Sequence, residues 1–160
     1  MRVCYPGTFD PITKGHLDII ERAARKFDEV EVLIMVNVRK KCLFSEVERK
    51  QMIIDSLREI GCPENVHVHV GSGLTVDFAK KLQAGAVIRG IRAVSDYEYE
   101  LQQATANMAL DRDLETIFLI AKPEFSFLSS SVVKEIAINK GDISEFVPEA
   151  IIPRVLEKYE

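Results

Sequence analysis

The sequence has no tryptophan, few histidines and cysteines, and no excess of basic residues. Its three cysteines, Cys4, Cys42 and Cys62, are far apart and form no C-x-x-C pair, which argues against a disulfide framework and against a zinc site. We therefore expect reduced thiols in a cytoplasmic protein. Because 25 acidic residues outnumber 21 basic ones, for a net charge of −4, a protein that coats nucleic acid is disfavoured.

Long apolar runs and linkers are also missing. The longest segment without Asp, Glu, Lys or Arg covers residues 65–76, whereas a membrane-spanning helix needs about 20 apolar residues. The N-terminus lacks the basic stretch, apolar run and cleavage site of a secretory signal. No low-complexity tract or flexible linker divides the chain. We therefore expect no membrane segment and a single domain over residues 1–160.

Short β-rich segments alternate with helical ones along the chain. The pattern predicts strands over 2–5, 29–36, 66–70, 86–88 and 116–121. It predicts helices over 18–27, 45–57, 75–83, 96–110 and 130–139, and a helical tail over 148–159 that is kinked or split by Pro153. This alternation indicates an α/β fold, namely a Rossmann-like domain whose five-stranded parallel sheet has helices on both faces. Ligands of such sheets bind at the carboxyl ends of the strands, where strand order reverses.

Two common phosphate-binding motifs are absent. No G-x-x-x-x-G-K-[ST] segment occurs, so a P-loop nucleotidase is disfavoured. Gly71-Ser72-Gly73 follows a predicted strand, but Val76 stands where the dinucleotide-binding fingerprint needs glycine. We interpret this segment as a strand-to-helix turn.

The turn after the first strand is more informative. Thr13 is a suitable N-cap, which places Gly15 and His16 in the first helical turn. The free N–H groups and the dipole of a helix N-terminus favour an anion, and Gly15 leaves room for a phosphate to approach the backbone. His16 would then lie beside that anion. The alternative is a surface histidine on an amphipathic helix.

A second candidate segment, Phe125–Ser131, precedes a predicted helix. It ends in three consecutive serines, which supply backbone and side-chain donors without bulk, as the β and γ phosphates of a nucleotide require. The alternative is ordinary N-capping by a single serine.

Basic residues follow two of the predicted strands. Lys40 and Lys41 lie after the second strand, and Arg89 and Arg92 lie at the end of the fourth. Cations delivered from two strand ends can clamp a phosphoryl group during its transfer. Gly90 would let the backbone approach a ligand there.

Together these motifs resemble the bacterial phosphopantetheine adenylyltransferases over essentially the whole chain. The T-x-G-H motif alone would indicate only the wider nucleotidyltransferase superfamily. The resemblance rests on four segments in order, Tyr5–His16, Arg39–Phe44, Ile88–Glu100 and Phe125–Glu135. Two positions depart from the expected pattern: Leu128 stands where isoleucine is expected, and Phe125 stands where some members carry tryptophan.

The resemblance implies an enzyme that transfers the adenylyl group of ATP to 4′-phosphopantetheine, giving 3′-dephospho-coenzyme A and pyrophosphate in the penultimate step of coenzyme A synthesis. It also implies Mg²⁺ bound with ATP, coenzyme A as a candidate inhibitor, and a homohexamer. Direct attack by a phosphate oxygen, already anionic at neutral pH, needs no general base, so the lack of a Ser/His/Asp triad is no objection.

The resemblance also implies roles for particular residues. His16 would stabilise the transition state, with Thr8 and Lys40 also assigned to catalysis. The phosphopantetheine substrate would contact Thr8, Lys40, Leu74, Thr75 and Arg89. ATP would contact Thr8, Phe9, His16, Gly90, Ile91, Arg92, Glu100, Phe125, Ser126, Phe127, Leu128, Ser129, Ser130 and Ser131. No dedicated metal ligands are expected.

Several alternatives remain open. A nicotinamide-mononucleotide adenylyltransferase would use the same ATP site, and a non-catalytic ATP sensor would need the phosphate-binding turns but not His16 beside Lys40 and Arg89. Asp10 could build the turn before Pro11 or contact a ligand. Taken by itself, Glu100 would lie on a solvated helix face.

Overall fold

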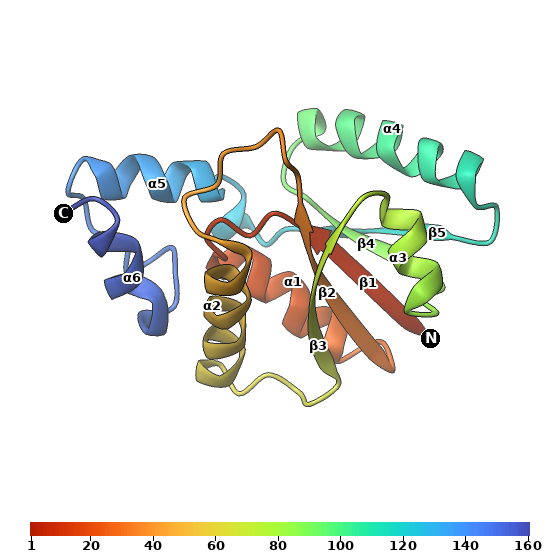
Figure 1. Cartoon of the computed structure of the whole chain (residues 1–160), viewed down its shortest axis with the longest axis horizontal. Coiled ribbons are helices and arrows are strands. Elements are labelled where there is room, and N and C mark those ends of the chain that lie inside the picture. The colour runs from red at the N-terminus through yellow and green to blue at the C-terminus, as the bar shows by residue number, and fades with distance from the viewer.

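The computed structural model describes residues 1–160 and contains one parallel sheet of five strands in the order β3-β2-β1-β4-β5 (Figure 1). The strands are β1 (Arg2–Gly7), β2 (Glu29–Val36), β3 (Val66–Ser72), β4 (Ala86–Ile91) and β5 (Glu115–Ile120). The helices are α1 (Lys14–Ala24), α2 (Glu46–Glu59), α3 (Thr75–Lys81), α4 (Val94–Leu110), α5 (Ser130–Ile138) and α6 (Ile152–Glu157). The chain first builds outward from β1 to β3 and then crosses back to β4. The strand order therefore reverses between β1 and β4, and the predicted fold class is confirmed.

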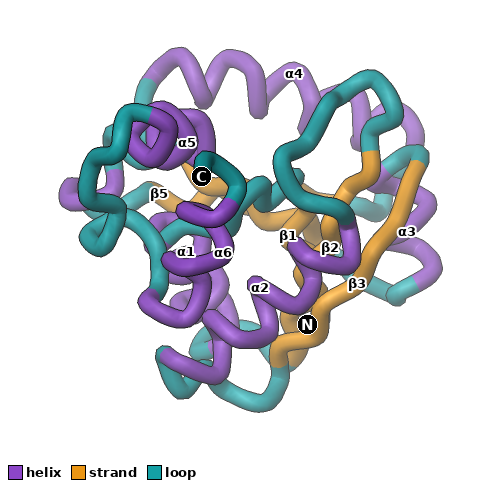
Figure 2. The backbone as a smooth tube through the Cα atoms, turned by 60° about the vertical axis from the view of Figure 1, so that its left-hand side comes forward, coloured by secondary structure: helices purple, strands orange, loops and turns teal.

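Helices cover both faces of the sheet. The first face, packed against α1 and α2, carries a core cluster of 25 buried residues. The C-terminal helices α5 and α6 lie side by side and add residues such as Val133 and Val155 to that cluster (Figure 2). The second face, packed against α3 and α4, carries a cluster of only five buried residues. No helix combines the length and apolar character that crossing a membrane requires.

The starts of α1 and α2 follow from local sequence. Ser45 is the N-cap of α2: its hydroxyl accepts a hydrogen bond from the Glu48 N–H (3.2 Å), and the Glu48 carboxylate accepts one from the Ser45 N–H (2.7 Å). This is the predicted capping box, which satisfies two backbone donors that a helix start leaves free. Thr13 caps α1 in the same way, as its side chain accepts from the His16 N–H.

Strand ends differ from the prediction where sheet pairing extends them. β4 continues past Arg89 to Ile91, because Arg89, Gly90 and Ile91 align with residues 118–120 of β5. β3 likewise continues to Ser72, so of the predicted turn only Gly73, with φ +94°, lies outside the strand. Residue alternation does not reveal such extensions, because the pairing partner lies far along the chain.

Helix ends differ as well. α1 ends at Ala24, before Phe27, and α4 begins at Val94, before Asp96. The C-terminal tail splits into a 3-10 turn (Glu149–Ile151) and α6, in whose first turn Pro153 lies. A proline is tolerated there because its missing N–H would have no intrahelical partner.

Candidate active site

A two-lobed cleft opens where the strand order reverses. Its larger lobe has a volume of about 390 Å³ and its smaller lobe about 210 Å³. Both lobes share a junction formed by the end of β1, by β4 and by α4, and lined by Pro6, Gly7, Thr8, Arg89 and Glu100. The carboxyl ends of parallel strands meet at one edge of a sheet, so this position is the one expected for a ligand.

Most of the candidate residues line this cleft. The larger lobe collects those from the β1–α1 turn, the loop after β2, the end of β4, α4 and the serine segment (Phe125–Ser131), namely Thr8, Phe9, His16, Lys40, Arg89, Gly90, Arg92, Glu100, Phe125, Leu128, Ser129 and Ser130. Thr75 lines the smaller lobe together with Thr8, Arg89 and Glu100.

Five candidate residues line neither lobe, and the structure accounts for three of them directly. The Ile91 side chain is buried, Leu74 is 53% exposed at the N-cap of α3, and Phe127 packs edge-on against Phe146 at 5.7 Å between ring centroids. The other two, Ser126 and Ser131, are exposed.

The β1–α1 turn presents free backbone donors to the cleft. The N–H groups of Thr8, Phe9 and Gly15 donate to no acceptor within the chain. Phe9 has φ 51°, and its ring covers Gly7, where a Cβ would come within 2.8 Å of the Phe9 ring. Several free N–H groups around a helix N-terminus form an anion-binding concavity. The turn therefore has the free donors that the predicted phosphate site would need.

His16 is held in one tautomer by the start of its own helix. The Thr13 N–H donates to His16 Nδ1 at 3.1 Å, which completes a capping box with histidine in place of the usual acid or amide. Because Nδ1 accepts this bond, the proton of the neutral ring is on Nε2. The imidazole is therefore oriented by backbone, with its N–H available to a ligand in the larger lobe.

The His16 ring is uncharged near neutral pH. Burial, as the largest cause, and the nearby cations Arg92 and Arg89 together lower the pKa of His16 from its ordinary value near 6.5 to about 4. The ring also packs edge-on against Phe9 at 5.1 Å. Burial of the ring is thus the largest cause of the lowered pKa.

Arg89 and Glu100 form a bidentate ion pair at the junction of the lobes. Arg89 Nε and Nη2 each lie 2.6 Å from a Glu100 carboxylate oxygen, and Arg89 Nη1 donates to the Pro6 carbonyl. Three of the five N–H groups of the guanidinium are thus used, which leaves two for a ligand. Glu100 is 8% exposed, so it does not lie on a solvated helix face. It holds Arg89 in orientation.

Arg92 joins β4 to the serine segment. Its Nη1 donates to the Leu128 carbonyl at 2.7 Å, and its Nε lies 3.0 Å from Asp96 Oδ2. Asp96, in the first turn of α4, is a cleft residue that sequence reasoning did not single out; it pairs with Arg92, which lies just before the helix.

The serine segment is more structural than its sequence indicates. Ser129 is the N-cap of α5, accepting from the Val132 N–H at 3.2 Å, and the Ser130 hydroxyl donates to the Pro11 carbonyl at 2.7 Å. Two of the three hydroxyls therefore already have partners within the chain. The segment closes the larger lobe against the β1–α1 turn.

Asp10 is the turn-builder of this region. Its buried carboxylate accepts from the Leu43 and Phe44 N–H groups at 2.8 and 2.9 Å and pairs with Lys134 at 3.2 Å. The loop that rises beyond the end of β2 and carries Lys40 (Figure 1) is thereby tied to the β1–α1 turn. The sequence left open whether Asp10 builds the turn or contacts a ligand, and its contacts within the chain are those of a turn-building residue.

Sequence reasoning missed most of the smaller lobe. Its wall includes one side of α4, formed by Tyr99, Gln103 and Asn107, opposite Met35 and Thr116. The α4 residues recur at the three- to four-residue spacing of one helix face, a signal that could have found them once Glu100 was known to face the cleft.

Comparison with known proteins identifies the class to which this chain belongs. The cytidylyltransferase-like family matches residues 4–136. A solved structure of the nicotinic acid mononucleotide adenylyltransferase of Plasmodium falciparum, complexed with NaAD, superposes with a TM-score of 0.73 over 99% of this chain and 98% of that one. At 15% identity this likeness concerns the fold, which is that of a nucleotidyltransferase.

Closer relatives specify the family. The chain is 48% identical to the phosphopantetheine adenylyltransferase of Finegoldia magna over 99% of its own length and 96% of the relative's. It is 50% identical to that of Heliobacterium modesticaldum over 97% of its length and 90% of the relative's. The chain therefore belongs to the phosphopantetheine adenylyltransferase family of cytidylyltransferase-like proteins.

Proposed function

We propose that the protein, a single domain over residues 1–160, transfers the adenylyl group of ATP to 4′-phosphopantetheine, giving 3′-dephospho-coenzyme A and pyrophosphate. Family membership supports this reaction. The observation that carries the chemistry is the meeting of two lobes at Thr8 and Arg89, with an uncharged His16 in the larger lobe. Two substrates can each occupy one lobe and react where the lobes join.

The larger lobe suits ATP and the smaller lobe suits the pantetheine arm. The free N–H groups of the β1–α1 turn and the cation Arg92 are matched to phosphates in the larger lobe. Thr75, Gln103 and Asn107 offer a hydroxyl and two amides, which match an arm built around amide bonds. Thr8 and the two unused N–H groups of Arg89 at the junction, with Lys40 in the larger lobe, are left for the acceptor phosphate.

The reaction is a direct in-line displacement. An oxygen of the acceptor phosphate forms a bond to the α-phosphorus of ATP, the bond from that phosphorus to the oxygen bridging to the β-phosphate breaks, and pyrophosphate leaves with the electron pair. His16 Nε2–H donates a hydrogen bond to the α-phosphate oxygens as charge builds on them. A neutral donor already held in position by Thr13 needs no reorganisation during the reaction.

Magnesium is proposed to arrive bound to ATP. The two cleft carboxylates, Asp96 and Glu100, are both paired with arginines, and no group of three or more His, Cys, Asp or Glu side chains is arranged to hold a metal. This donor set fits an ion coordinated by substrate phosphates and water. The chain's own contribution is to bind and orient the phosphates that carry the ion.

Self-association and regulation follow from the same proposal. Helix α4 and the end of β5 expose large apolar side chains, including Val94, Leu101, Met108, Leu110 and Ile120, which suits subunit contacts in the proposed homohexamer. Coenzyme A, which shares the pantetheine arm, is proposed to compete for the smaller lobe as an inhibitor. We further propose that the enzyme acts in the cytoplasm without nucleic-acid or membrane partners.

Pyrophosphate release from Mg-ATP, with 4′-phosphopantetheine and nicotinamide mononucleotide as parallel acceptors, tests the proposal. We expect release only with phosphopantetheine, together with dephospho-coenzyme A identified by mass. Release only with the nicotinamide nucleotide would keep the chemistry and change the substrate. No pyrophosphate release with either acceptor, despite measurable ATP binding, would favour a non-catalytic ATP sensor.

A further inference from the structure

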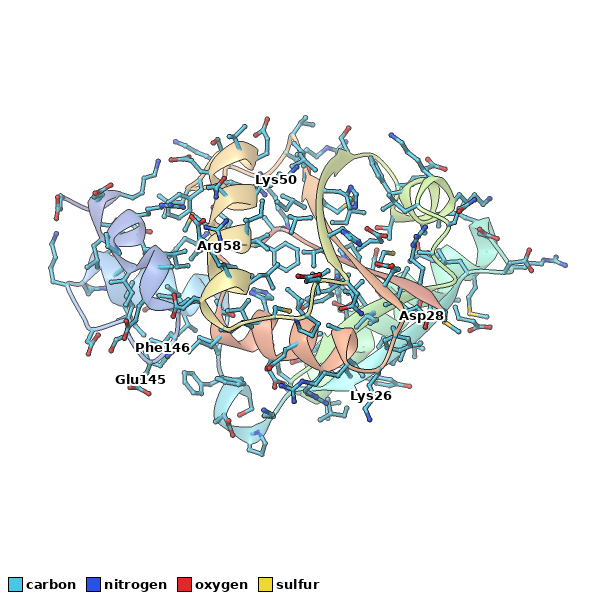
Figure 3. The ribbon with its side chains drawn as sticks, turned by 90° about the horizontal axis from the view of Figure 1, so that it is seen from below. Lys26, Asp28, Lys50, Arg58, Glu145 and Phe146 are labelled. Carbon is cyan, nitrogen blue, oxygen red and sulfur yellow. The ribbon has the colours of Figure 1, made fainter.

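A buried arginine lies behind the β1–α1 turn. Arg49, in the first turns of α2, is 3% exposed and lines neither lobe of the cleft. Its neighbour Lys50, labelled on α2 in Figure 3, is exposed. Burial of an arginine is unusual, and buried charged groups are normally paired.

The Arg49 side chain makes one hydrogen bond and no ion pair. Its Nη1 donates to the Thr8 carbonyl at 2.8 Å, while its buried Nε has no partner. None of the chain's ion pairs includes it, and the carboxylate of Asp10 in the same turn is paired with Lys134 instead. A buried cation with so few partners gains little for the fold itself, which points to a role at the turn that it touches.

The orientation of the Thr8 carbonyl sets the orientation of the next N–H group in the cleft wall. It belongs to the peptide that joins Thr8 to Phe9, and Phe9 has φ 51°, a conformation that persists in a bulky residue only where its surroundings impose it. In a trans peptide the C=O and N–H bonds point in opposite directions. Because Arg49 draws the carbonyl toward α2, behind the cleft wall, the Phe9 N–H, which has no acceptor in the chain, is directed the other way.

We propose that Arg49 is a positioning residue for the transfer reaction: its guanidinium holds the Thr8–Phe9 peptide so that the Phe9 N–H and the Thr8 hydroxyl meet phosphate at the junction of the lobes. This inference rests on the proposed function. Since no carboxylate neutralises Arg49, an anionic phosphate in the cleft also acts as its counter-charge. Phosphate binding and the turn conformation are thereby coupled through one side chain.

The test compares Arg49→Met with Arg49→Lys and with the control Lys50→Met. Arg49→Met removes the donor and the charge and keeps an apolar stem, whereas a lysine can still reach a single carbonyl. We expect kcat to fall about tenfold to a hundredfold in Arg49→Met, the range for losing a hydrogen bond to a charged group. Arg49→Lys should recover most of that loss, and Lys50→Met should match the wild type.

A second readout does not depend on turnover. Pyrophosphate should raise the Tm of the wild type and of Lys50→Met, and it should raise the Tm of Arg49→Met by less than half as much. If wild-type protein transfers no adenylyl group to any acceptor, the proposed function fails, and this Tm shift still decides whether Arg49 is coupled to phosphate binding.

The contrary outcomes are distinct. Wild-type kcat together with a wild-type pyrophosphate shift in Arg49→Met would overturn the inference. Equal damage in Arg49→Lys and Arg49→Met would also overturn it, because packing rather than the contact with Thr8 would then explain the loss. If Arg49→Met does not fold, Arg49→Gln, whose shorter side chain carries no charge, takes its place and is expected to show less than half of the wild-type pyrophosphate shift.

Discussion

The two faces of the sheet differ in how many apolar side chains they bury. The first face, under α1 and α2, carries 25 buried apolar residues, to which α5 and α6 also contribute. The second face, under α3 and α4, carries five, and the long helix α4 buries only Glu100 and Ala104. The side of α4 that turns to the cleft is mostly polar. Buried apolar side chains are therefore concentrated on one face, whereas the other face lines the smaller lobe of the cleft.

Matched leucine substitutions measure this asymmetry, and the largest effect is expected from them. Leu17→Ala on the first face, where Leu17 is 3% exposed, should lower the free energy of unfolding by about 3–5 kcal/mol. Leu114→Ala on the second face, where Leu114 is 2% exposed, should cost about 2–3 kcal/mol, because a small cluster can collapse around the cavity. Chemical denaturation measures both. An equal loss of unfolding free energy in the two variants would contradict the proposed difference between the faces.

His16→Gln separates chemistry from folding on the first face. Glutamine can accept the Thr13 N–H as the third residue of a capping box, so α1 should keep its start. Glutamine keeps an amide donor, but not at the place of the imidazole Nε2–H, and this displacement should lower kcat by up to about 10²–10³, or about 2.7–4 kcal/mol, the range for removing one donor to a developing oxyanion. Steady-state kinetics with saturating ATP and acceptor measure it. An unchanged kcat would withdraw the role of His16.

The depressed pKa of His16 predicts a smaller effect, on stability against pH. The unfolded chain binds a proton at His16 below pH 6.5, whereas the folded protein binds it only near pH 4. The stabilisation is therefore fully present above pH 6.5 and is lost as the pH falls from 6.5 to 4. Over this interval the free energy of unfolding of the wild type should fall by about 1–3 kcal/mol more than that of His16→Gln. Parallel stability curves of the two proteins would contradict the assignment.

The smallest effect is expected on the second face. Asn107→Ala removes an amide from the wall of the smaller lobe and should raise the KM for phosphopantetheine by about fivefold to tenfold, as the loss of one hydrogen bond would. The KM for ATP and the stability should hardly change. Steady-state kinetics with each substrate varied in turn measure this. A change confined to ATP would reverse the assignment of the two lobes.

Most of the large-scale structure could be predicted from sequence, because it depends on local patterns. Apolar β-rich segments alternating with helices specify a parallel sheet, and the strand over Glu29–Val36 matches in full. The capping box at Ser45 and the N-cap at Thr13 depend only on neighbouring residues. The T-x-G-H motif places His16 at a helix start for the same reason.

Long-range contacts account for what could not be predicted. Glu100 appears solvated in sequence, yet it is buried against Arg89, 11 residues earlier in the chain. Asp10 meets Leu43 and Phe44 across a separation of more than 30 residues, and Ser130 meets Pro11 across 119. Nothing in local periodicity reports such pairs.

The sequence by itself thus determined the alternation of strands and helices, the starts of α1 and α2, and the chemical types gathered at the strand ends. Only the tertiary structure decided which polar side chains are free for a ligand and which are bound within the chain. Arg49 illustrates the difference. Its spacing from Met52 and Ile53 places it on the buried side of α2, but only the packing of that helix against the β1–α1 turn brings its guanidinium to the Thr8 carbonyl. Local patterns are set by neighbours along the chain, whereas the availability of a polar group depends on partners that folding brings together.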